Sequence, residues 1–389
     1  MSISVLIAVV HWLGIGLTAV ATGYACAALY AVVRASSPPS LIDDVCHNEP
    51  CPIESVSVLK PLDGAEPGLH ENLRSFCLQA HPDYQLIFGV RAVDDPAIDI
   101  VNKLRAEFPR LAITLVVDPR THGTNPKVSN LINMLPHAMH SWLVLADSDI
   151  RVPANYLVRV TAPLANPAVG IVTCLYRGIA RRGFWSRLGR LFIDDWFAPS
   201  VWLSHAFGST RFAFGSTIAL RRETLASIGG FEVLRDTLAD DFWLGELTRR
   251  RGLRTLLSDL VIGTEVVEDR LNTLWAHELR WLRTIRAIAP LGFAMTWICF
   301  TSPVLLLGLA LEPSTWNEVI TLTGGIARVL LYFFQRRFAH EASPWYEVLL
   351  VPLRDGLLLL EWATALTSWR VTWRGEILHA RGDGHAPHY

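Results

Sequence analysis

Apolar and polar positions divide the chain into an apolar N-terminal stretch, a long mixed region and a C-terminal part with several apolar runs. Residues 2–33 contain no Asp, Glu, Lys or Arg, and about 20 apolar residues suffice to cross a bilayer. The stretch lacks a basic start and is too long for the apolar core of a cleaved signal peptide. We therefore predict an N-terminal transmembrane anchor over residues 2–33, whose end at Arg34 faces the cytoplasm.

Three further apolar blocks follow in the C-terminal part: Ala287–Leu311, Ile320–Phe334 and Val348–Ser368. Charged residues interrupt the second and third of these blocks: Arg328, Arg354, Asp355 and Glu361. Charges inside membrane segments are costly and usually face protein or water. We therefore expect residues 287–389 to form a membrane region with two or three transmembrane or re-entrant segments and a short tail.

The region from residue 55 to residue 286 alternates β-rich runs with helical patterns. The β-rich runs are Val56–Leu62, Gln85–Val93, Ile113–Val117 and Trp142–Leu145. The helical patterns are Leu69–Ala80, Pro96–Phe108, Lys127–Ala138 and Ala154–Leu164. This alternation predicts one α/β domain over residues 55–286, with a mostly parallel sheet and crossover helices. In such sheets ligands bind at the carboxyl ends of the strands.

Composition agrees with a membrane protein and excludes one class of partner. Hydrophobic residues make up 51% and charged residues 18% of the chain, against about 25% charged residues in an ordinary soluble domain. The formal net charge of −1 argues against a nucleic-acid partner. The six cysteines form no zinc spacing, and we expect them to be reduced, although Cys46 and Cys51 could pair in an oxidising compartment.

Two acidic pairs follow predicted strands. After the second strand, Asp95 is expected to cap the next helix, which leaves Asp94 free to accept from a base or ribose group. Asp147 and Asp149 follow the apolar run WLVLA, and two carboxylates on one turn can share a divalent cation with a diphosphate. A polar turn without a ligand is the alternative for this second pair.

Two more constellations lie further along the chain. Asp240 and Asp241 open a predicted helix, where the helix dipole alone would already favour acids. The run from His277 to Trp281 contains Arg280, which either binds a diphosphate or belongs to a basic stripe facing lipid headgroups. The segment 184–205 carries three tryptophans and is either interfacial or a buried helix of the domain.

The order of these motifs resembles the family 2-type glycosyltransferases and, more narrowly, the ceramide glucosyltransferases of family 21. The segments that carry the resemblance are Val58–Leu62, Glu71–Phe76, Asp95–Asp99, Asn125–Leu131 and Asp147–Val152. The resemblance runs from about residue 56 to residue 286. It implies a GT-A-type nucleotide-diphospho-sugar transferase domain joined to transmembrane helices.

The resemblance also implies a role for each motif. Donor-binding residues would be Asp94, Lys127, Asp147, His277, Arg280 and Trp281. Asp147 and Asp149 would hold Mg²⁺ or Mn²⁺, and Asp241 would be the catalytic base. His277 stands where the family's (Q/R)xxRW motif has Gln or Arg, and a protonated histidine could still donate to a phosphate.

Residues 128–135 and 277–284 look most similar to a bacterial branch of this family that adds an N-acetylhexosamine to bacteriohopanetetrol. We therefore predict an inverting enzyme that moves one sugar from a UDP-sugar to a hydroxyl of a membrane lipid. The lipid is a hopanoid or, alternatively, ceramide. The protein would be integral to a bacterial inner membrane, with its catalytic domain in the cytoplasm. A processive polysaccharide synthase and a non-catalytic membrane scaffold are the competing interpretations.

Overall fold

The computed structural model describes residues 2–35, 53–181, 183–336, 344–373 and 376–379, which fall into two compact units. Among the described residues, the helical unit comprises 2–35, 180–181, 183–208, 268–336, 344–373 and 376–379. The sheet unit comprises 53–179 and 209–267. Cys46 and Cys51, for which a disulfide was considered, lie outside the described residues.

The sheet unit is built on an eight-stranded sheet with the order β3-β2-β1-β4-β7-β6-β8-β5. The strands are β1 (Val56–Pro61), β2 (Tyr84–Val90), β3 (Ala112–Val117), β4 (Trp142–Ala146), β5 (Ile150–Arg151), β6 (Val169–Ala180), β7 (Thr217–Arg221) and β8 (Arg254–Val266). Strands β3, β2, β1 and β4 pair in parallel, whereas β7 runs antiparallel to β4 and β6, and β5 runs antiparallel to β8. The parallel half brings the carboxyl ends of β1, β2 and β4 to one edge, where the acidic motifs follow.

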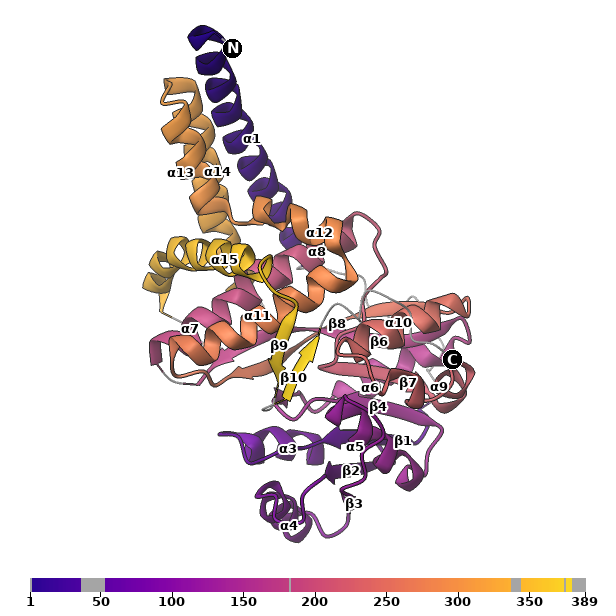
Figure 1. Cartoon of the computed structure of the whole chain (residues 1–389). Coiled ribbons are helices and arrows are strands. Elements are labelled where there is room, and N and C mark those ends of the chain that lie inside the picture. Colours follow the sequence, from indigo (N-terminus) through magenta and orange to yellow (C-terminus); the bar gives the residue numbers. More distant parts are fainter. Residues whose placement is uncertain (1, 36–52, 182, 337–343, 374–375, 380–389) are drawn as a thin grey trace. The chain divides into compact units, whose positions relative to one another are not determined.

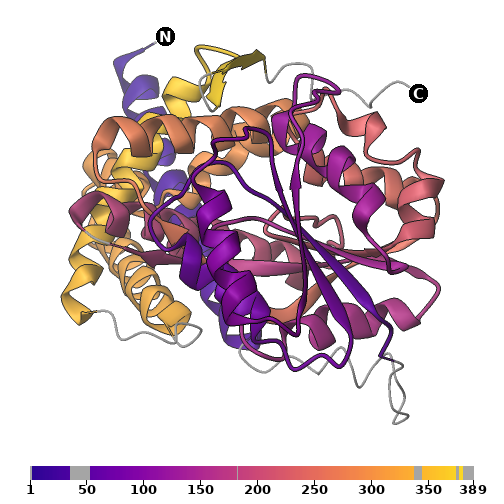
Figure 2. The same ribbon diagram turned by 90° about the horizontal axis from the view of Figure 1, so that it is seen from below.

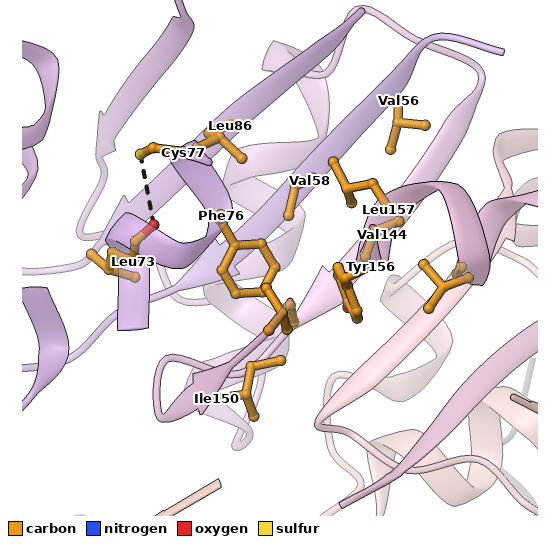
Figure 3. Packing of buried hydrophobic residues seen from close by; sticks show 14 of the residues in the cluster. Val56, Val58, Leu73, Phe76, Cys77, Leu86, Val144, Ile150, Tyr156 and Leu157 are labelled. Carbon is orange, nitrogen blue, oxygen red and sulfur yellow. Dashed lines mark hydrogen bonds between the residues drawn. The ribbon is translucent and has the colours of Figure 1, made fainter. Parts of the chain in front are cut away.

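One face of this sheet is covered by α3 (Leu69–Cys77), α4 (Ala97–Glu107) and α6 (Tyr156–Thr161). Alternate strand positions supply the facing side chains, among them Val56 and Val58 of β1, because successive strand residues point to opposite faces. The rings of Phe76 and Tyr156 meet edge to face, with their centroids 5.4 Å apart (Figure 3). Burial of each large apolar side chain here contributes roughly 1.5–3 kcal/mol to folding.

The opposite face carries α5 (Pro126–Met134), which begins at a capped position. The Asn125 side chain accepts a hydrogen bond from the Val128 backbone nitrogen at 3.1 Å, and Pro126 fits the first turn because it needs no donor. The helix packs closely on β2, since Asn130 donates to the Gly89 carbonyl at 2.8 Å. These two contacts fix the start of α5 near the carboxyl edge of the sheet.

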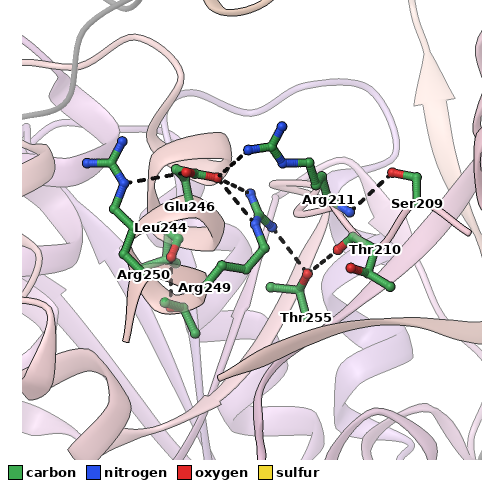
Figure 4. Close-up of polar contacts among 9 residues, drawn as sticks. Ser209, Thr210, Arg211, Leu244, Glu246, Arg249, Arg250 and Thr255 are labelled. Carbon is green, nitrogen blue, oxygen red and sulfur yellow. Dashed lines mark hydrogen bonds and ion pairs between the residues drawn. The ribbon is translucent and has the colours of Figure 1, made fainter. Parts of the chain in front are cut away.

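Helix α10 (Asp240–Arg250) begins at Asp240, so both predicted acids lie in its first turn. Its other end is tied down by a polar cluster, in which Arg249 donates to Glu246 at 3.1 Å and to the Thr255 hydroxyl at 3.2 Å (Figure 4). A Cβ added at Gly245 would lie 2.6 Å from the Ala213 Cβ. The segment that leads into β7 therefore packs directly against α10.

The helical unit contains one long N-terminal helix and several shorter helices. They are α1 (Ile3–Ala35), α7 (Gly183–Phe192), α8 (Ala198–Ala206), α11 (Leu271–Ile288), α12 (Pro290–Met295), α13 (Thr301–Leu311), α14 (Thr315–Gln335) and α15 (Val351–Ala365), whereas α9 (Arg222–Ser227) belongs to the sheet unit. A two-stranded hairpin, β9 (Arg370–Trp373) and β10 (Glu376–His379), follows. Within the described residues, α1 is long and apolar enough to cross a membrane, and Pro290–Cys299 with Thr301–Leu311 forms a second candidate bent by 69°.

Helix α1 packs against α13 and α14 through small residues, and the three helices lie side by side in Figure 1. Gly14 allows a close backbone approach, because an added Cβ would lie 2.8 Å from the Gly308 carbonyl oxygen. The Thr22 hydroxyl donates to the Ile320 carbonyl at 3.0 Å. The predicted anchor is thus part of a helical bundle rather than an isolated helix.

The charges that interrupt the apolar blocks are buried and paired, as expected for charges that face protein. Arg328 binds Asp195 at 3.2 Å and Asp355 at 2.9 Å. Arg354 binds Glu278 at 3.0 Å and also pairs with Glu361. In the segment 184–205, Trp196 and Trp202 are likewise buried, but the segment belongs to the helical unit and not to the sheet unit, and its interfacial position stays a prediction. The number of C-terminal spans stays a prediction.

Candidate functional site

The turn Asp147-Ser148-Asp149 directly follows the buried strand β4 and is held from two sides. The Lys60 ammonium, at the end of β1, donates to the Asp147 carbonyl oxygen at 2.6 Å. The Thr264 hydroxyl donates to Asp149 Oδ2 at 2.8 Å. Both carboxylates of the turn are partly exposed, so they can accept a ligand without unfolding the turn.

Lys127 brings this turn together with the start of α10. Its Nζ lies 2.7 Å from Asp147 Oδ1 and 3.7 Å from Asp240 Oδ2. Burial opposes the charge of Lys127, but the carboxylates of Asp147 and Asp240 outweigh it and raise the pKa of the lysine above its usual value. The predicted donor-binding residue Lys127 therefore carries a full positive charge inside an acidic cluster.

Asp241, the predicted base, is fixed by two backbone donors. Its Oδ2 accepts from the Gly215 nitrogen at 2.9 Å, and its Oδ1 accepts from the Phe242 nitrogen at 2.7 Å. Burial, followed by the like charge of Asp240, raises the pKa of Asp241 to about 6. A carboxylate with a pKa near 6 is ionised at neutral pH and still basic enough to take a proton.

Gly215 lies at the centre of the cluster and was not identified from the sequence. A Cβ added at this position would lie 3.0 Å from Lys127 Nζ and 3.4 Å from both Asp147 Oδ2 and Asp241 Oδ2. The predicted metal ligand, donor-binding lysine and base thus surround one point. Because Gly215 has no side chain, the lysine and the two carboxylates can approach one another this closely.

Lys60 is a second residue that the sequence did not single out as functional. It is fully buried, and its ammonium lies 3.7 Å from the centroid of the Phe76 ring. Burial lowers the pKa of Lys60 to about 7, against the opposing effect of Asp147 and Asp149. One signal in the sequence could have found it, because the chain has only three lysines among its 35 basic residues.

The two acids after β2 have different surroundings, and Asp95 has the helix-capping contacts that were predicted for it. Asp95 is buried, and its carboxylate accepts from the Ala97 nitrogen at 2.8 Å and from the Gly64 nitrogen at 3.1 Å. This confirms that Asp95 holds the start of α4. Asp94 is exposed, and its role in binding the nucleotide stays a prediction.

His277, Arg280 and Trp281 belong to the helical unit, on α11. The His277 Nδ1 pairs with the Glu268 carboxylate, and the imidazole meets the Trp281 ring edge-on at 5.2 Å. The structure thus brings His277 and Trp281 together. The donor-binding roles of these three residues stay predictions.

The other arginines of the α11 run bind the chain beyond α15. Arg286 donates to the Ala365 carbonyl at 2.7 Å, and its guanidinium lies 3.7 Å from the centroid of the Trp369 ring. Arg283 donates to the Arg370 carbonyl. Cations commonly satisfy the last carbonyls of a helix in this way. For these two arginines, the basic stripe therefore has a structural role within the unit.

A divalent cation fits the turn after β4 only together with a ligand. Asp147 and Asp149 offer carboxylate oxygens, which Mg²⁺ and Mn²⁺ prefer. No group of three or more His, Cys, Asp or Glu side chains that could hold a metal occurs in the part of the chain that the structure describes. The remaining ligands would have to come from a diphosphate and water.

Comparison with known proteins gives consistent results. Ceramide glucosyltransferase 1 of Caenorhabditis elegans is 26% identical over 212 residues, which cover 54% of this chain and 45% of that protein. Ceramide glucosyltransferase 3 of the same organism is 24% identical over 239 residues, which cover 61% of this chain and 52% of that protein. The chain therefore spans about half the length of the curated relatives it matches.

Among solved structures, a mannosyltransferase from Pyrobaculum calidifontis in complex with GDP-Man and Mn²⁺ matches with a TM-score of 0.54 and 22% identity. The match covers 92% of this chain and 99% of that chain. This likeness confirms the predicted fold, a GT-A-like α/β domain with an N-terminal helix that could span a membrane.

The family model of Glycosyl transferase family 21 matches residues 14–386, which is nearly the whole chain. The match includes the turn after β4, the start of α10 and the helices of the C-terminal part. The narrower resemblance to the hopanoid-associated branch is not part of this finding. The chain belongs to glycosyl transferase family 21.

Proposed function

We propose that this protein is a membrane-bound inverting glycosyltransferase that moves one sugar from a UDP-sugar to a hydroxyl group of a membrane lipid. The observation that carries the proposal is the grouping of Asp147, Lys127 and Asp241 around Gly215. Family membership and the apolar helix α1 support a sugar transferase that acts at a membrane. The grouping supplies a base, a cation and metal ligands at one place.

Asp241 would act as the general base. In a single displacement, the lipid oxygen forms a bond to C1 of the sugar while the bond from C1 to the diphosphate oxygen breaks. The electron pair of the broken bond leaves with UDP, and the proton of the lipid hydroxyl moves to Asp241. Each oxygen of Asp241 accepts one backbone hydrogen bond, which leaves further lone pairs for this proton.

The negative charge that develops on UDP needs stabilisation. Asp147 and Asp149 would hold a Mg²⁺ or Mn²⁺ ion, which supplies electrophilic stabilisation when bound. The Lys127 ammonium would bind the diphosphate from the same side. Arg280, on α11, is proposed as a further donor to the diphosphate, and Trp281 is proposed to contact the sugar or the acceptor.

Two lipid classes are candidates for the acceptor. The names of the curated relatives support ceramide. The likeness of residues 128–135 and 277–284 supports a hopanoid, with N-acetylglucosamine transferred to bacteriohopanetetrol. Both lipids present a hydroxyl on an apolar body and would reach the site from the membrane.

The test is mass spectrometry of lipids from a deletion strain, together with assays of the purified full chain. We expect one glycolipid to disappear from the strain, and we expect the chain to release UDP when one of the two lipids is present. A product with many sugars would favour a polysaccharide synthase instead. No UDP release with any acceptor would favour a non-catalytic scaffold.

We also propose that the catalytic domain faces the cytoplasm of a bacterium, where UDP-sugars are made. Arg34, at the end of α1, motivates this orientation through the positive-inside tendency. A cysteine introduced at Arg120, whose side chain is 70% exposed, should react with an impermeant reagent only after the membrane is opened. Labelling in intact cells would contradict this orientation and place the catalytic domain outside the cytoplasm.

A further inference from the structure

Lysine is used in this chain in an unusual way. The sequence has only Lys60, Lys103 and Lys127, while arginine supplies the remaining basic residues. Two of these three lysines, Lys60 and Lys127, lie in the acidic cluster. An ammonium is a compact point charge on a flexible stem, whereas a guanidinium is a rigid fork suited to permanent pairs. This distribution suggests that the cluster needs cations that can change partners.

The two lysines differ in what they bind. Lys60 is fully buried and donates to the main-chain carbonyl of Asp147, so it leaves the carboxylate oxygens of that residue available. Lys127 instead binds Asp147 Oδ1 at 2.7 Å, an oxygen that a divalent cation would need. Lys127 is therefore the lysine that competes with a metal ion.

A second acidic partner is already within reach of Lys127. Asp240 Oδ2 lies 3.7 Å from Lys127 Nζ, and no side chain of Gly215 stands between the two residues and Asp147. A small rotation of the lysine side chain would move its ammonium from Asp147 toward Asp240 or toward a ligand phosphate. The four aspartates and two lysines of the cluster leave two negative charges when all are ionised, which is the charge that one divalent cation balances.

We propose that Lys127 occupies Asp147 in the donor-free enzyme and releases this carboxylate only when a divalent cation arrives together with a nucleotide diphosphate. A cation alone would have to displace the lysine and then remain beside its positive charge. A diphosphate removes this conflict, because its oxygens can bind the cation and the ammonium at once. Cation and donor therefore bind as a coupled pair. The inference rests on the proposed use of a divalent cation at Asp147 and Asp149.

The experiment measures Mn²⁺ binding to the purified full chain by electron paramagnetic resonance, with and without UDP. The variants are Lys127→Met and, as a matched control, Lys103→Met, since Lys103 is exposed on α4. We expect UDP to tighten Mn²⁺ binding to the unmodified chain roughly tenfold or more, within the usual range of coupling between two sites. Lys127→Met should bind Mn²⁺ alone roughly tenfold more tightly and lose most of the coupling to UDP, because the competing ammonium is gone. Lys103→Met should behave like the unmodified chain.

The possible results separate this inference from the proposed function. If the unmodified chain binds Mn²⁺ with UDP but Lys127→Met binds Mn²⁺ alone no more tightly, the role given to Lys127 is wrong and the metal site stands. If no Mn²⁺ binds even with UDP, both the metal assignment and this inference are wrong. Should Lys127→Met fail to fold, Lys127→Gln gives the same comparison, because its neutral amide can still donate to Asp147.

Discussion

The two units of this protein hold their buried charges in different ways. In the sheet unit, Lys60 and Lys127 both contact Asp147, and Lys127 also lies near Asp240. In the helical unit two arginines, Arg328 and Arg354, serve the carboxylates Asp195, Asp355, Glu278 and Glu361. The side chains of both arginines are at most 5% exposed, whereas those of Lys127 and Asp147 are 19% and 34% exposed.

The arginine pairs hold segments of the helical unit together, whereas the lysine contacts belong to the proposed donor site. Arg328 donates to Asp355 from two of its nitrogens and to Asp195 from a third contact, so it ties α14 to α15 and to the segment after α7. A planar guanidinium that is buried away from water suits such a permanent ion pair. In the sheet unit, Lys60 is likewise buried, but the side chain of Lys127 is 19% exposed, and exchange of its partner for a ligand is part of our proposal. The predictions below test this contrast, starting from the largest expected effect.

Replacing Arg354 with Met should be the most damaging change. It would leave the buried carboxylates Glu278 and Glu361 without a cation, and the loss of one partner from a buried ion pair costs about 3–5 kcal/mol. We expect a large drop in the thermal unfolding midpoint of the full chain in detergent. Arg120→Met is the control, because Arg120 pairs with Asp118 at the surface. An Arg354→Met midpoint close to that of the control would contradict the structural role.

Replacing Asp241 with Asn should reduce transfer by a factor on the order of 10² or more, which is typical for the loss of a general base. The fold and the UDP-sugar affinity should change little, because other residues bind the donor. The measurement is paired kinetics and donor binding for Asp241→Asn and Asp240→Asn. If Asp240→Asn is inactive and Asp241→Asn is normal, the base is the neighbouring residue. If both variants stay active, the base lies elsewhere.

Replacing Gly215 with Ala tests whether the space at the centre of the cluster is used. The new methyl group would lie 3.0 Å from Lys127 Nζ and 3.4 Å from the two carboxylates, all at the ends of flexible side chains. The fold should tolerate this, but the methyl group would displace a ligand, so we expect kcat/KM to fall roughly tenfold. Gly325→Ala on α14 is the control, since a Cβ there meets no atom within 4 Å. Equal activity of the two variants would show that the position is not used.

Much of the fold could be predicted from the sequence, because hydrophobic periodicity determines where strands and helices form. The main errors were at the ends of the elements. The helix predicted over Lys127–Ala138 ends at Met134 and continues as a 3₁₀ turn over Leu135–His137. Pro136 explains this, since it lacks a backbone donor and disfavours a helical residue before it. Strands β6, β7 and β8 were not predicted individually, because their pairing is a tertiary property.

The candidate site could be predicted only for residues with charged side chains at strand ends and helix starts. Asp147, Asp241 and Lys127 were named from motif order, and the structure brings these three together. Gly215 could not be found in this way, because it has no side chain that points to a chemistry, and a glycine before a strand is common. Thr264 was also missed, since its hydroxyl reaches Asp149 from a strand far along the chain.

The pH dependence of the transfer rate is expected to show a smaller effect, but it tests the role of Asp241 directly. Asp241 must be ionised to accept a proton, and its raised pKa of about 6 means that transfer should increase with pH and level off above about 6. Below that value the rate should fall roughly tenfold per pH unit. Asp240→Asn removes the neighbouring like charge, so the onset should move to lower pH. An unchanged onset in this variant would contradict the coupling of the two acids.

The smallest effect is expected for Glu278→Gln in the helical unit. Arg354 carries one positive charge but faces two buried carboxyl groups, Glu278 and Glu361. Burial, with the like charge of Glu361 adding to it, raises the pKa of Glu278 well above its ordinary value, which favours the protonated form of Glu278. A glutamine has nearly the same shape as a protonated glutamate.

Glu278→Gln should therefore change the unfolding midpoint and the transfer rate little, even though it lies between His277 and Arg280. Arg354 would remain paired with Glu361. The double variant Glu278→Gln/Glu361→Gln should cost far more than the sum of the single variants, because only the double change leaves Arg354 buried without a negative partner. Thermal unfolding of the four proteins in this cycle measures the difference. If the costs of the two single variants simply add up in the double variant, the two glutamates do not substitute for each other as partners of Arg354. This result would contradict the structural role that we give to the buried arginine pairs.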